Sequence, residues 1–70
     1  MKINYIAKEQ DKDKKLKDIL KRRLYISSEL LKKLKYADTI YVNGKLTYTN
    51  YLVQENDNIE VDLEKYIANK

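Results

Sequence analysis

The apolar residues between positions 26 and 36 recur at the spacing of one face of an α-helix. Leu30, Leu31 and Leu34 fall on that face, and the lysines among them lie outside it. Ser27 stands where an N-cap is needed, because its hydroxyl can accept a hydrogen bond from an N–H of the first turn. Ile26 and Leu31 occupy the two positions of a hydrophobic staple across that cap. The pattern therefore predicts a capped helix that ends near position 36.

After this helix the period changes to two. Ile40 and Val42 alternate with Tyr41, as in a half-buried strand, and the pair Asn43-Gly44 follows. An Asn-Gly pair favours a two-residue hairpin turn, because a type I′ turn requires positive φ at both central residues. We therefore expect a hairpin over residues 39–48. Its faces stay open from sequence: either a helix covers one face and the basic half of the chain reaches the other, or a bulge shifts the register.

Two elements and a loop are predicted ahead of this region. Residues 2–7 alternate weakly and suggest an edge strand, and the charged stretch 8–15 is interpreted as a loop running into a helix. That first helix should extend from about Lys14 to Leu24. Its apolar residues form a single stripe: Leu16, Ile19, Leu20 and Leu24. Because the connection to the second helix is short, the two helices should pack against each other.

The clearest strand pattern lies near the C-terminus, where Ile59, Val61 and Leu63 alternate with acidic residues. The acidic face of this strand should point away from the basic helices. Polar residues at 55–58 precede it and are typical of a turn. The tail, 65–70, is expected to be frayed.

These elements predict an α+β fold in which two short packed helices lie against a small, mostly antiparallel sheet that includes the Asn-Gly hairpin. Seventy residues are enough for one domain with a small core. We expect a single domain over 1–70, with its main body at about 14–63. The predicted core consists of Leu16, Ile19, Leu20, Leu31, Leu34, Ile40, Val42, Val53, Ile59 and Val61.

Composition limits the chemistry that these residues can perform. The chain has no Cys and no His, so disulfides, thiolate metal sites and the commonest acid–base catalyst are excluded. One glycine cannot make a glycine-rich phosphate loop. No secretory signal or membrane-spanning run is visible. We therefore expect a cytoplasmic protein with no membrane partner, no cofactor, no metal site and no catalytic residues in this chain.

The charge is distributed unevenly. Residues 1–35 hold 12 Lys and Arg against five Asp and Glu, whereas residues 36–70 hold three against six. A net charge of +7 in the helical half suggests a polyanionic partner, with nucleic acid ahead of an anionic membrane surface. The alternative is an ordinary lysine-rich surface. That alternative does not explain why the lysines avoid the second half.

Phosphate contacts are expected from basic residues on the helical face and the hairpin, namely Lys15, Arg22, Lys32, Lys33, Lys35 and Lys45. Tyr41 could stack on a base, or it could cover the outer side of the sheet. Only two of the fifteen basic residues are Arg, so recognition by shape and charge is favoured over base-specific readout.

Several short motifs together resemble the S-four RNA-binding domain, which is named after the fourth small-subunit ribosomal protein. They are a Leu-x-x-Ile-Leu helix at 16–20, Ile-Ser-Ser at 26–28, Leu-x-x-Leu at 31–34, Ile-Tyr-Val-Asn-Gly-Lys at 40–45, and Val53 with Asp-x-Ile at 57–59. The likeness covers about residues 14–63. It is greatest to the N-terminal domain of RNA pseudouridine synthases of the large-subunit type.

The resemblance implies an RNA-binding surface built from two helices and the adjoining hairpin. Carried over by position, it implies RNA contacts at Lys15, Ser27-Ser28, Lys32 and Lys45. The sequence departs from the family where Ser28 replaces an arginine and where Asn56-Asp57 replaces a Gly-Asp turn. The catalytic His-Arg-Leu-Asp motif of the synthases is absent, so the resemblance implies only the guide domain of such an isomerase, acting in rRNA modification.

The function that follows is that of a monomeric module that docks structured ribosomal or transfer RNA. Three alternatives remain: a stand-alone ribosome-associated RNA-binding protein, a protein–protein module with solvated lysines, and a winged DNA-binding domain. The last fits poorly, because its recognition helix should offer Arg, Asn or Gln to base edges. The second helix instead carries Ser28, Glu29, Lys32 and Lys33 at exposed positions.

Overall fold

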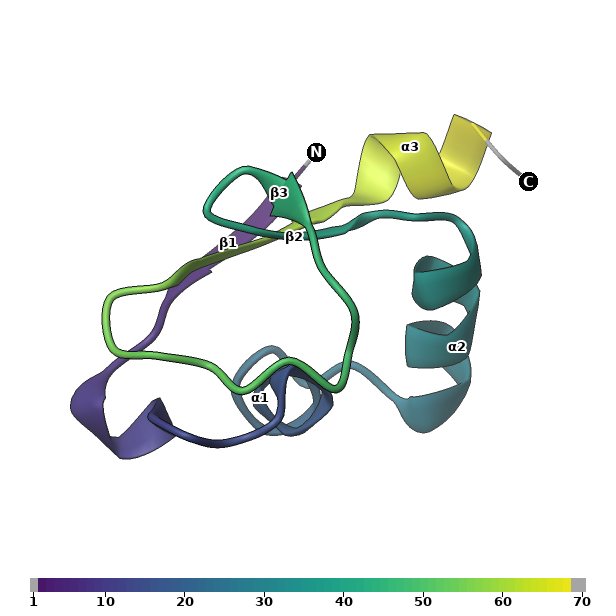
Figure 1. Ribbon diagram of the computed structural model, residues 1–70. Coiled ribbons are helices and arrows are strands. Elements are labelled where there is room, and N and C mark those ends of the chain that lie inside the picture. The colour runs from purple at the N-terminus through teal and green to yellow at the C-terminus, as the bar shows by residue number, and fades with distance from the viewer. Residues whose placement is uncertain (1, 69–70) are drawn as a thin grey trace.

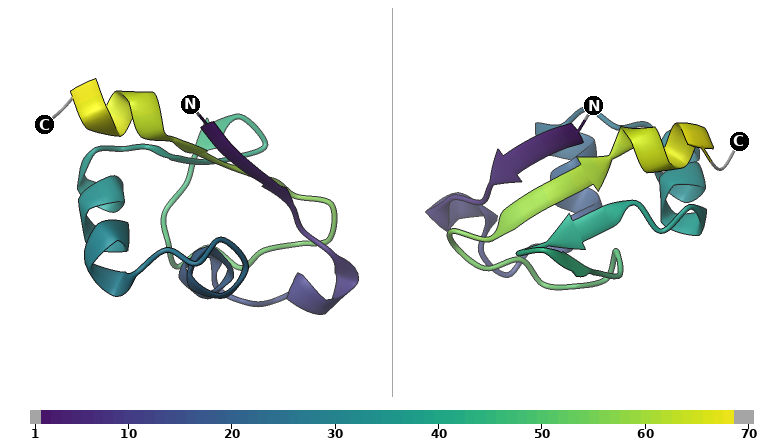
Figure 2. Two further views of the ribbon diagram at one scale, coloured as in Figure 1. Left: turned by 180° about the vertical axis from the view of Figure 1, so that it is seen from behind. Right: turned by 90° about the horizontal axis from the view of Figure 1, so that it is seen from above.

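The alternating residues near the C-terminus form the central strand of a four-stranded antiparallel sheet. In the computed structural model, which describes residues 2–68, β4 (Asn58–Asp62) pairs with β1 (Lys2–Ile6) on one side and with β2 (Ile40–Val42) on the other. The short strand β3 (Lys45–Leu46) follows β2 at the far edge, which gives the order β1-β4-β2-β3 (Figure 1; Figure 2, right). The α+β class predicted from sequence is confirmed.

The register of the sheet places its apolar residues in one inward row. Val61 lies opposite Ile3 in β1 and opposite Ile40 in β2, and Ile59 is likewise matched to Tyr5 and Val42 in its two neighbours. The residues that alternate with them, among them the acidic side chains of β4, point to the outer face. The prediction that the acidic face of this strand points away from the helices is therefore confirmed.

The helices α1 (Leu16–Arg23) and α2 (Ser28–Tyr36) cover the inward face of the sheet. Figure 1 shows α1 nearly end-on and α2 upright, so the two helices cross steeply. Every residue of the predicted core is buried, with exposed fractions from 0% to 7%. The Ser27 cap is also confirmed, since its hydroxyl accepts a hydrogen bond from the N–H of Leu30 at 3.1 Å.

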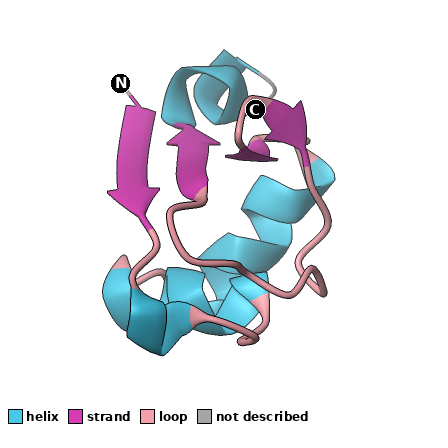
Figure 3. Cartoon of the chain, turned by 60° about the vertical axis from the view of Figure 1, so that its left-hand side comes forward, coloured by secondary structure: helices cyan, strands magenta, loops and turns pink. Residues whose placement is uncertain are grey.

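The N-terminus of α1 is satisfied by a distant loop rather than by its own cap. The N–H groups of Leu16 and Lys17 donate to the carbonyls of Tyr51 and Thr49, at 2.8 and 3.0 Å. Figures 1 and 3 show the loop between β3 and β4 passing beside α1. Because the N–H groups of the first turn have no partner within the helix, the loop that accepts from two of them decides where α1 begins. The helix therefore starts at Leu16, two residues after the predicted start.

Two predictions about irregular segments are wrong. The stretch 8–15, expected to be a loop, contains the 3-10 helix η1 (Glu9–Asp11), whose last residue is buried. The tail expected to be frayed instead forms α3 (Leu63–Ala68). The Asp62 carboxylate accepts a hydrogen bond from the N–H of Lys65 at 3.1 Å, which satisfies a donor of the first turn of α3. Residues 69–70 lie outside the described range.

Asn43 and Gly44 form the link between β2 and β3. Tyr41 lies opposite Leu46 and Val42 opposite Lys45, with φ of 53° at Asn43 and 82° at Gly44. Of the two arrangements left open by the sequence, the helices cover the Ile40 and Val42 side, and the strands pair without a bulge. Tyr41 therefore points to the outer face.

Substituting Gly44 tests this turn through backbone strain alone, because a Cβ added there would meet no atom within 4 Å. We expect Gly44→Val to lower the free energy of unfolding by about 1–3 kcal/mol, since a β-branched residue resists positive φ. Gly44→Asn should cost much less, because Asn tolerates the left-handed region. Urea unfolding of both variants measures the difference. Equal losses would show that the conformation of Gly44 does not matter to stability.

Candidate nucleic-acid interface

The basic residues predicted to bind phosphate are all exposed, but they lie on three different elements. Lys32, Lys33 and Lys35 project from α2, Lys45 lies on β3, and Lys15 and Arg22 lie at the two ends of α1. Within residues 2–68, only Lys33 of these six has an ionic partner. It lies 3.8 Å from Glu29 one turn earlier, and both side chains are largely solvated. Such a pair is weak in water and leaves the lysine available.

The structure brings two of these lysines together with the end of the β2–β3 pair. An open groove of about 420 Å³ runs between α2 and the segment that follows β3. Its lining residues come from both sides: Lys32, Lys35, Tyr36, Asp38, Ile40, Leu46, Thr47, Tyr48 and Thr49. Lys45 directly precedes this segment in the chain. The groove therefore lies between α2 and the segment that follows the β2–β3 pair, and its lining does not include Lys45 itself.

A second, wider hollow of about 750 Å³ lies on the other side of α2, between α2 and α3. Lys32, Tyr36 and Asp38 line both hollows. This second hollow adds Lys33 and Lys65 to its lining. Cations from α2 thus border both depressions.

The remaining predicted residues stand apart from the groove. Lys15 is the residue before α1, and its backbone bridges to Leu52 in the loop beside that helix. Arg22 lies near the other end of α1. The hydroxyl of Ser27 is already used as a helix cap, and Ser28 is the exposed first residue of α2. None of these four residues lines either hollow.

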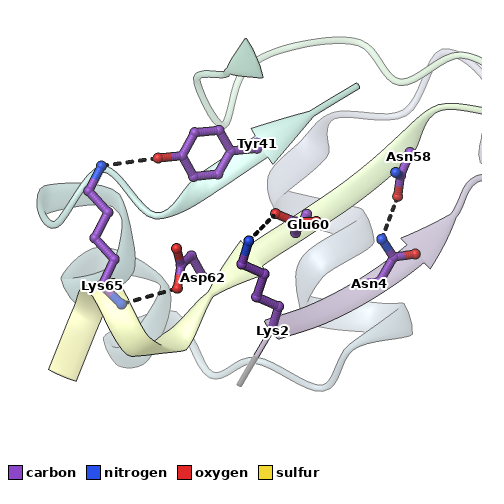
Figure 4. Close-up of polar contacts among 7 residues, drawn as sticks. All are labelled: Lys2, Asn4, Tyr41, Asn58, Glu60, Asp62 and Lys65. Atoms are coloured by element: carbon purple, nitrogen blue, oxygen red, sulfur yellow. Dashed lines mark hydrogen bonds and ion pairs between the residues drawn. The ribbon is translucent and has the colours of Figure 1, made fainter. Parts of the chain in front are cut away.

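Tyr41 lies on the outer face of the sheet. The Lys65 ammonium donates a hydrogen bond to its hydroxyl at 3.0 Å and sits 5.6 Å from its ring centroid (Figure 4). The hydrogen bond to Tyr41 raises the pKa of Lys65. On the same face Lys2 meets Glu60 at 3.7 Å, and Asn4 donates to Asn58 at 2.7 Å. Tyr41 therefore covers the outer side of the sheet, away from Lys32 and Lys35. This is the second of the two roles that the sequence left open for it.

Sequence reasoning missed the aromatic part of the groove. The Tyr36 and Tyr48 side chains are 84% and 79% exposed, and Leu46 beside them is 52% exposed. Tyr36 falls outside the apolar stripe of α2, and Tyr48 lies in a polar stretch. The only available signal was that both are large aromatic residues at positions where no core is predicted.

A buried carboxylate fixes the loop that borders the groove. Asp57 accepts hydrogen bonds from the Asn43 amide at 2.9 Å, the Tyr51 hydroxyl at 2.7 Å and the Gln54 N–H at 2.8 Å. Burial alone would raise the pKa of Asp57, but these donors hold its pKa below the ordinary value. The cluster ties the β2–β3 turn to the long loop and so limits movement of the groove wall.

A second buried carboxylate, Asp11, joins β1 to α1. It accepts from the N–H of Lys8 at 2.9 Å, from the Tyr5 hydroxyl and from Nε of Arg23 at 3.1 Å. Burial raises its pKa, but these three donors together bring the pKa below the usual 3.8. Both carboxylates are thus structural anchors that have every polar atom paired.

Two kinds of feature are absent from the described residues, a cluster of metal ligands and a membrane-spanning helix. No group of three or more acidic side chains within 2–68 is arranged to hold a metal ion. No helix in that range is both long enough and apolar enough to cross a bilayer.

We found no significant match to a protein-family model, a curated protein or a solved structure.

Proposed function

We propose that this chain is an RNA-binding module of the S-four type, which docks structured ribosomal or transfer RNA. The observation that carries the proposal is the separation of charge across the fold. Within residues 2–68, Lys32 and Lys35 of α2 border a groove that ends at the β2–β3 pair and have no carboxylate partner, whereas on the outer face of the sheet carboxylates balance the lysines, with Lys2 3.7 Å from Glu60. Such a charge distribution attracts phosphates to the groove side more strongly than to the outer face of the sheet.

In this proposal the module acts as a monomer in the cytoplasm and serves as the guide domain of an RNA pseudouridine synthase. It would hold the RNA while an attached catalytic domain isomerises uridine. The sequence motifs at 26–28 and 40–45 support this assignment. The absence of cysteine fits a reducing compartment.

The groove lysines provide the test. Lys32→Ala combined with Lys35→Ala should weaken binding to an RNA stem-loop and flatten the plot of log K against log salt concentration by about 1.5, since each lost phosphate contact removes about 0.7–0.9. Different stem-loop sequences should be weakened alike, because phosphate contacts position the RNA and do not specify its sequence. Filter-binding titrations at several salt concentrations measure both effects.

The matched control removes two exposed lysines away from the groove, with Lys2→Ala and Lys12→Ala in one chain. This pair lowers the net charge equally but should leave the salt slope unchanged. A third chain with Lys15→Ala and Arg22→Ala shows whether α1 belongs to the same surface. If the groove pair and the control pair lose equal affinity, only diffuse charge attraction remains. In that case the proposed interface must be abandoned.

A further inference from the structure

Two exposed tyrosines face the same groove from opposite sides of it. Tyr36 is the last residue of α2, and Tyr48 lies just after β3. The two tyrosines thus come from separate segments of the chain that the fold brings to one groove. Their side chains are 84% and 79% exposed, and the half-exposed Leu46 lies in the same lining. The groove therefore has an apolar aromatic wall within a strongly polar surface.

The fold itself makes no use of these two rings. Neither ring belongs to the core cluster or to the half-buried residues packed on it, in contrast to Tyr5, Tyr51 and Tyr66. Across residues 2–68, neither hydroxyl takes part in a hydrogen bond. Exposed aromatic rings that gather at one place mark binding surfaces more often than scattered ones do. A ligand that covers both rings would account for their placement.

The charges around the rings indicate what that ligand is. Lys32 and Lys35 line the groove, and within the described part of the chain no carboxylate pairs with either one. Asp38 is the one acidic lining residue, and its charge also acts on Lys65, whose pKa it helps to raise. The groove thus offers flat apolar faces with two available cations next to them. A volume of about 420 Å³ also lies within the usual range of small-ligand sites, roughly 300–1,000 Å³.

We propose that this groove takes an unpaired nucleotide of RNA, with its base stacked on Tyr36 and Tyr48 and its phosphates held by Lys32 and Lys35. The inference rests on the proposed RNA-binding function and adds to it the class of RNA element recognised. A base inside a duplex cannot offer its face to a tyrosine, whereas a loop or single-stranded base can. Because every base has a π-face, stacking here should tolerate any sequence.

Single substitutions of the tyrosines test the inference with two probes. One probe is single-stranded oligoadenylate RNA of about ten nucleotides, which is within the site sizes of such surfaces, carrying a central 2-aminopurine. The other is a blunt RNA duplex. We expect Tyr36→Ala and Tyr48→Ala each to weaken binding of the single strand by about fivefold to 150-fold. Each should also reduce the quenching of 2-aminopurine and leave the duplex affinity and the salt slope unchanged.

The chain contains a closely matched control. Tyr25 is 89% exposed but lies before the first residue of α2, at the opposite end of that helix from Tyr36. Tyr25→Ala should leave binding of both probes unchanged, and Tyr36→Phe should keep the affinity because it keeps the ring. Thermal midpoints of all four variants should stay near that of the parent, since the substituted side chains are exposed.

The results separate this inference from the function on which it rests. If the unaltered protein binds neither these two probes nor the stem-loop, both proposals fail; if it binds the stem-loop but not the single strand, only the stacking site is wrong. If it binds both probes with a steep salt dependence, but Tyr25→Ala weakens the single strand as much as Tyr36→Ala and Tyr48→Ala do, the RNA-binding function stands and the assigned stacking site is wrong. The same conclusion follows if none of the three alanine variants changes the affinity.

Discussion

Replacing Leu34 with alanine should lower the free energy of unfolding by about 2–5 kcal/mol. The Leu34 side chain is fully buried near the end of α2, shortly before the chain enters β2. The backbone carbonyl of Leu34 accepts hydrogen bonds from both the hydroxyl and the N–H of Thr39, at 2.9 and 3.3 Å. A cavity at this point would loosen the packing that holds α2 against β2. A domain of this size has only about 4–10 kcal/mol of stability, so the loss is a large fraction of the total.

The control for this prediction is the same substitution at an exposed leucine. Leu52 is 49% exposed and contacts Lys15 through its backbone, which alanine preserves. Leu52→Ala should therefore cost well under half of the Leu34→Ala effect. Urea unfolding followed by circular dichroism compares the two variants. Similar losses would mean that α2 does not depend on Leu34 for its packing.

The parts of the fold that sequence predicted correctly are those set by local periodicity. The stripe on α2 and the alternation in β4 each require one face to be apolar, and a packed core requires the same. The Ser27 cap is also a local device, since donor and acceptor lie three residues apart. Local patterns of this kind are visible in the sequence without knowledge of any distant contact.

The parts that sequence did not predict depend on distant contacts. The start of α1 depends on carbonyls of Thr49 and Tyr51, more than 30 residues away in the chain. The burial of Asp11 depends on Arg23 and Tyr5, which reach it from α1 and β1. In a stretch as charged as 8–15, nothing distinguishes one buried aspartate from its solvated neighbours.

The candidate site divides in the same way. The charge asymmetry identified the lysines of α2, because net charge can be counted from sequence. Which of them share a surface depends on where the segment after β3 returns to α2, and only the structure places Tyr48 beside Lys32 and Lys35. For Tyr41 the charge count gives no guidance, because neighbouring residues of a strand point to opposite faces of the sheet. Its place on the outer face is known only from the structure.

Asp11→Asn is expected to lower the free energy of unfolding by about 2–4 kcal/mol at pH 7, because all three partners of this buried carboxylate are donors. The amide nitrogen of Asn cannot accept a hydrogen bond, so either Arg23 or the pair Tyr5 and Lys8 would lose its acceptor. The Arg23 contact contributes the smaller share, since its side chain is 38% exposed and water screens it. Asp18→Asn on α1 is the control, with a loss of at most a few tenths of a kcal/mol.

The pH dependence of the same variant distinguishes a charged anchor from a merely well-packed one. Because hydrogen bonds hold the pKa of Asp11 below 3.8 in the folded state, the unfolded chain binds the proton more readily in acid. The stabilisation by the carboxylate is therefore complete above about pH 5 and is lost as the pH falls through the folded pKa. The lowered pKa of Asp57 also makes stability fall in acid, but it does so equally in parent and variant and cancels from the difference. The difference in unfolding free energy between parent and Asp11→Asn should thus shrink steadily below pH 4 in urea titrations. A difference that stayed constant down to pH 2 would show that Asp11 contributes through shape and not through its charge.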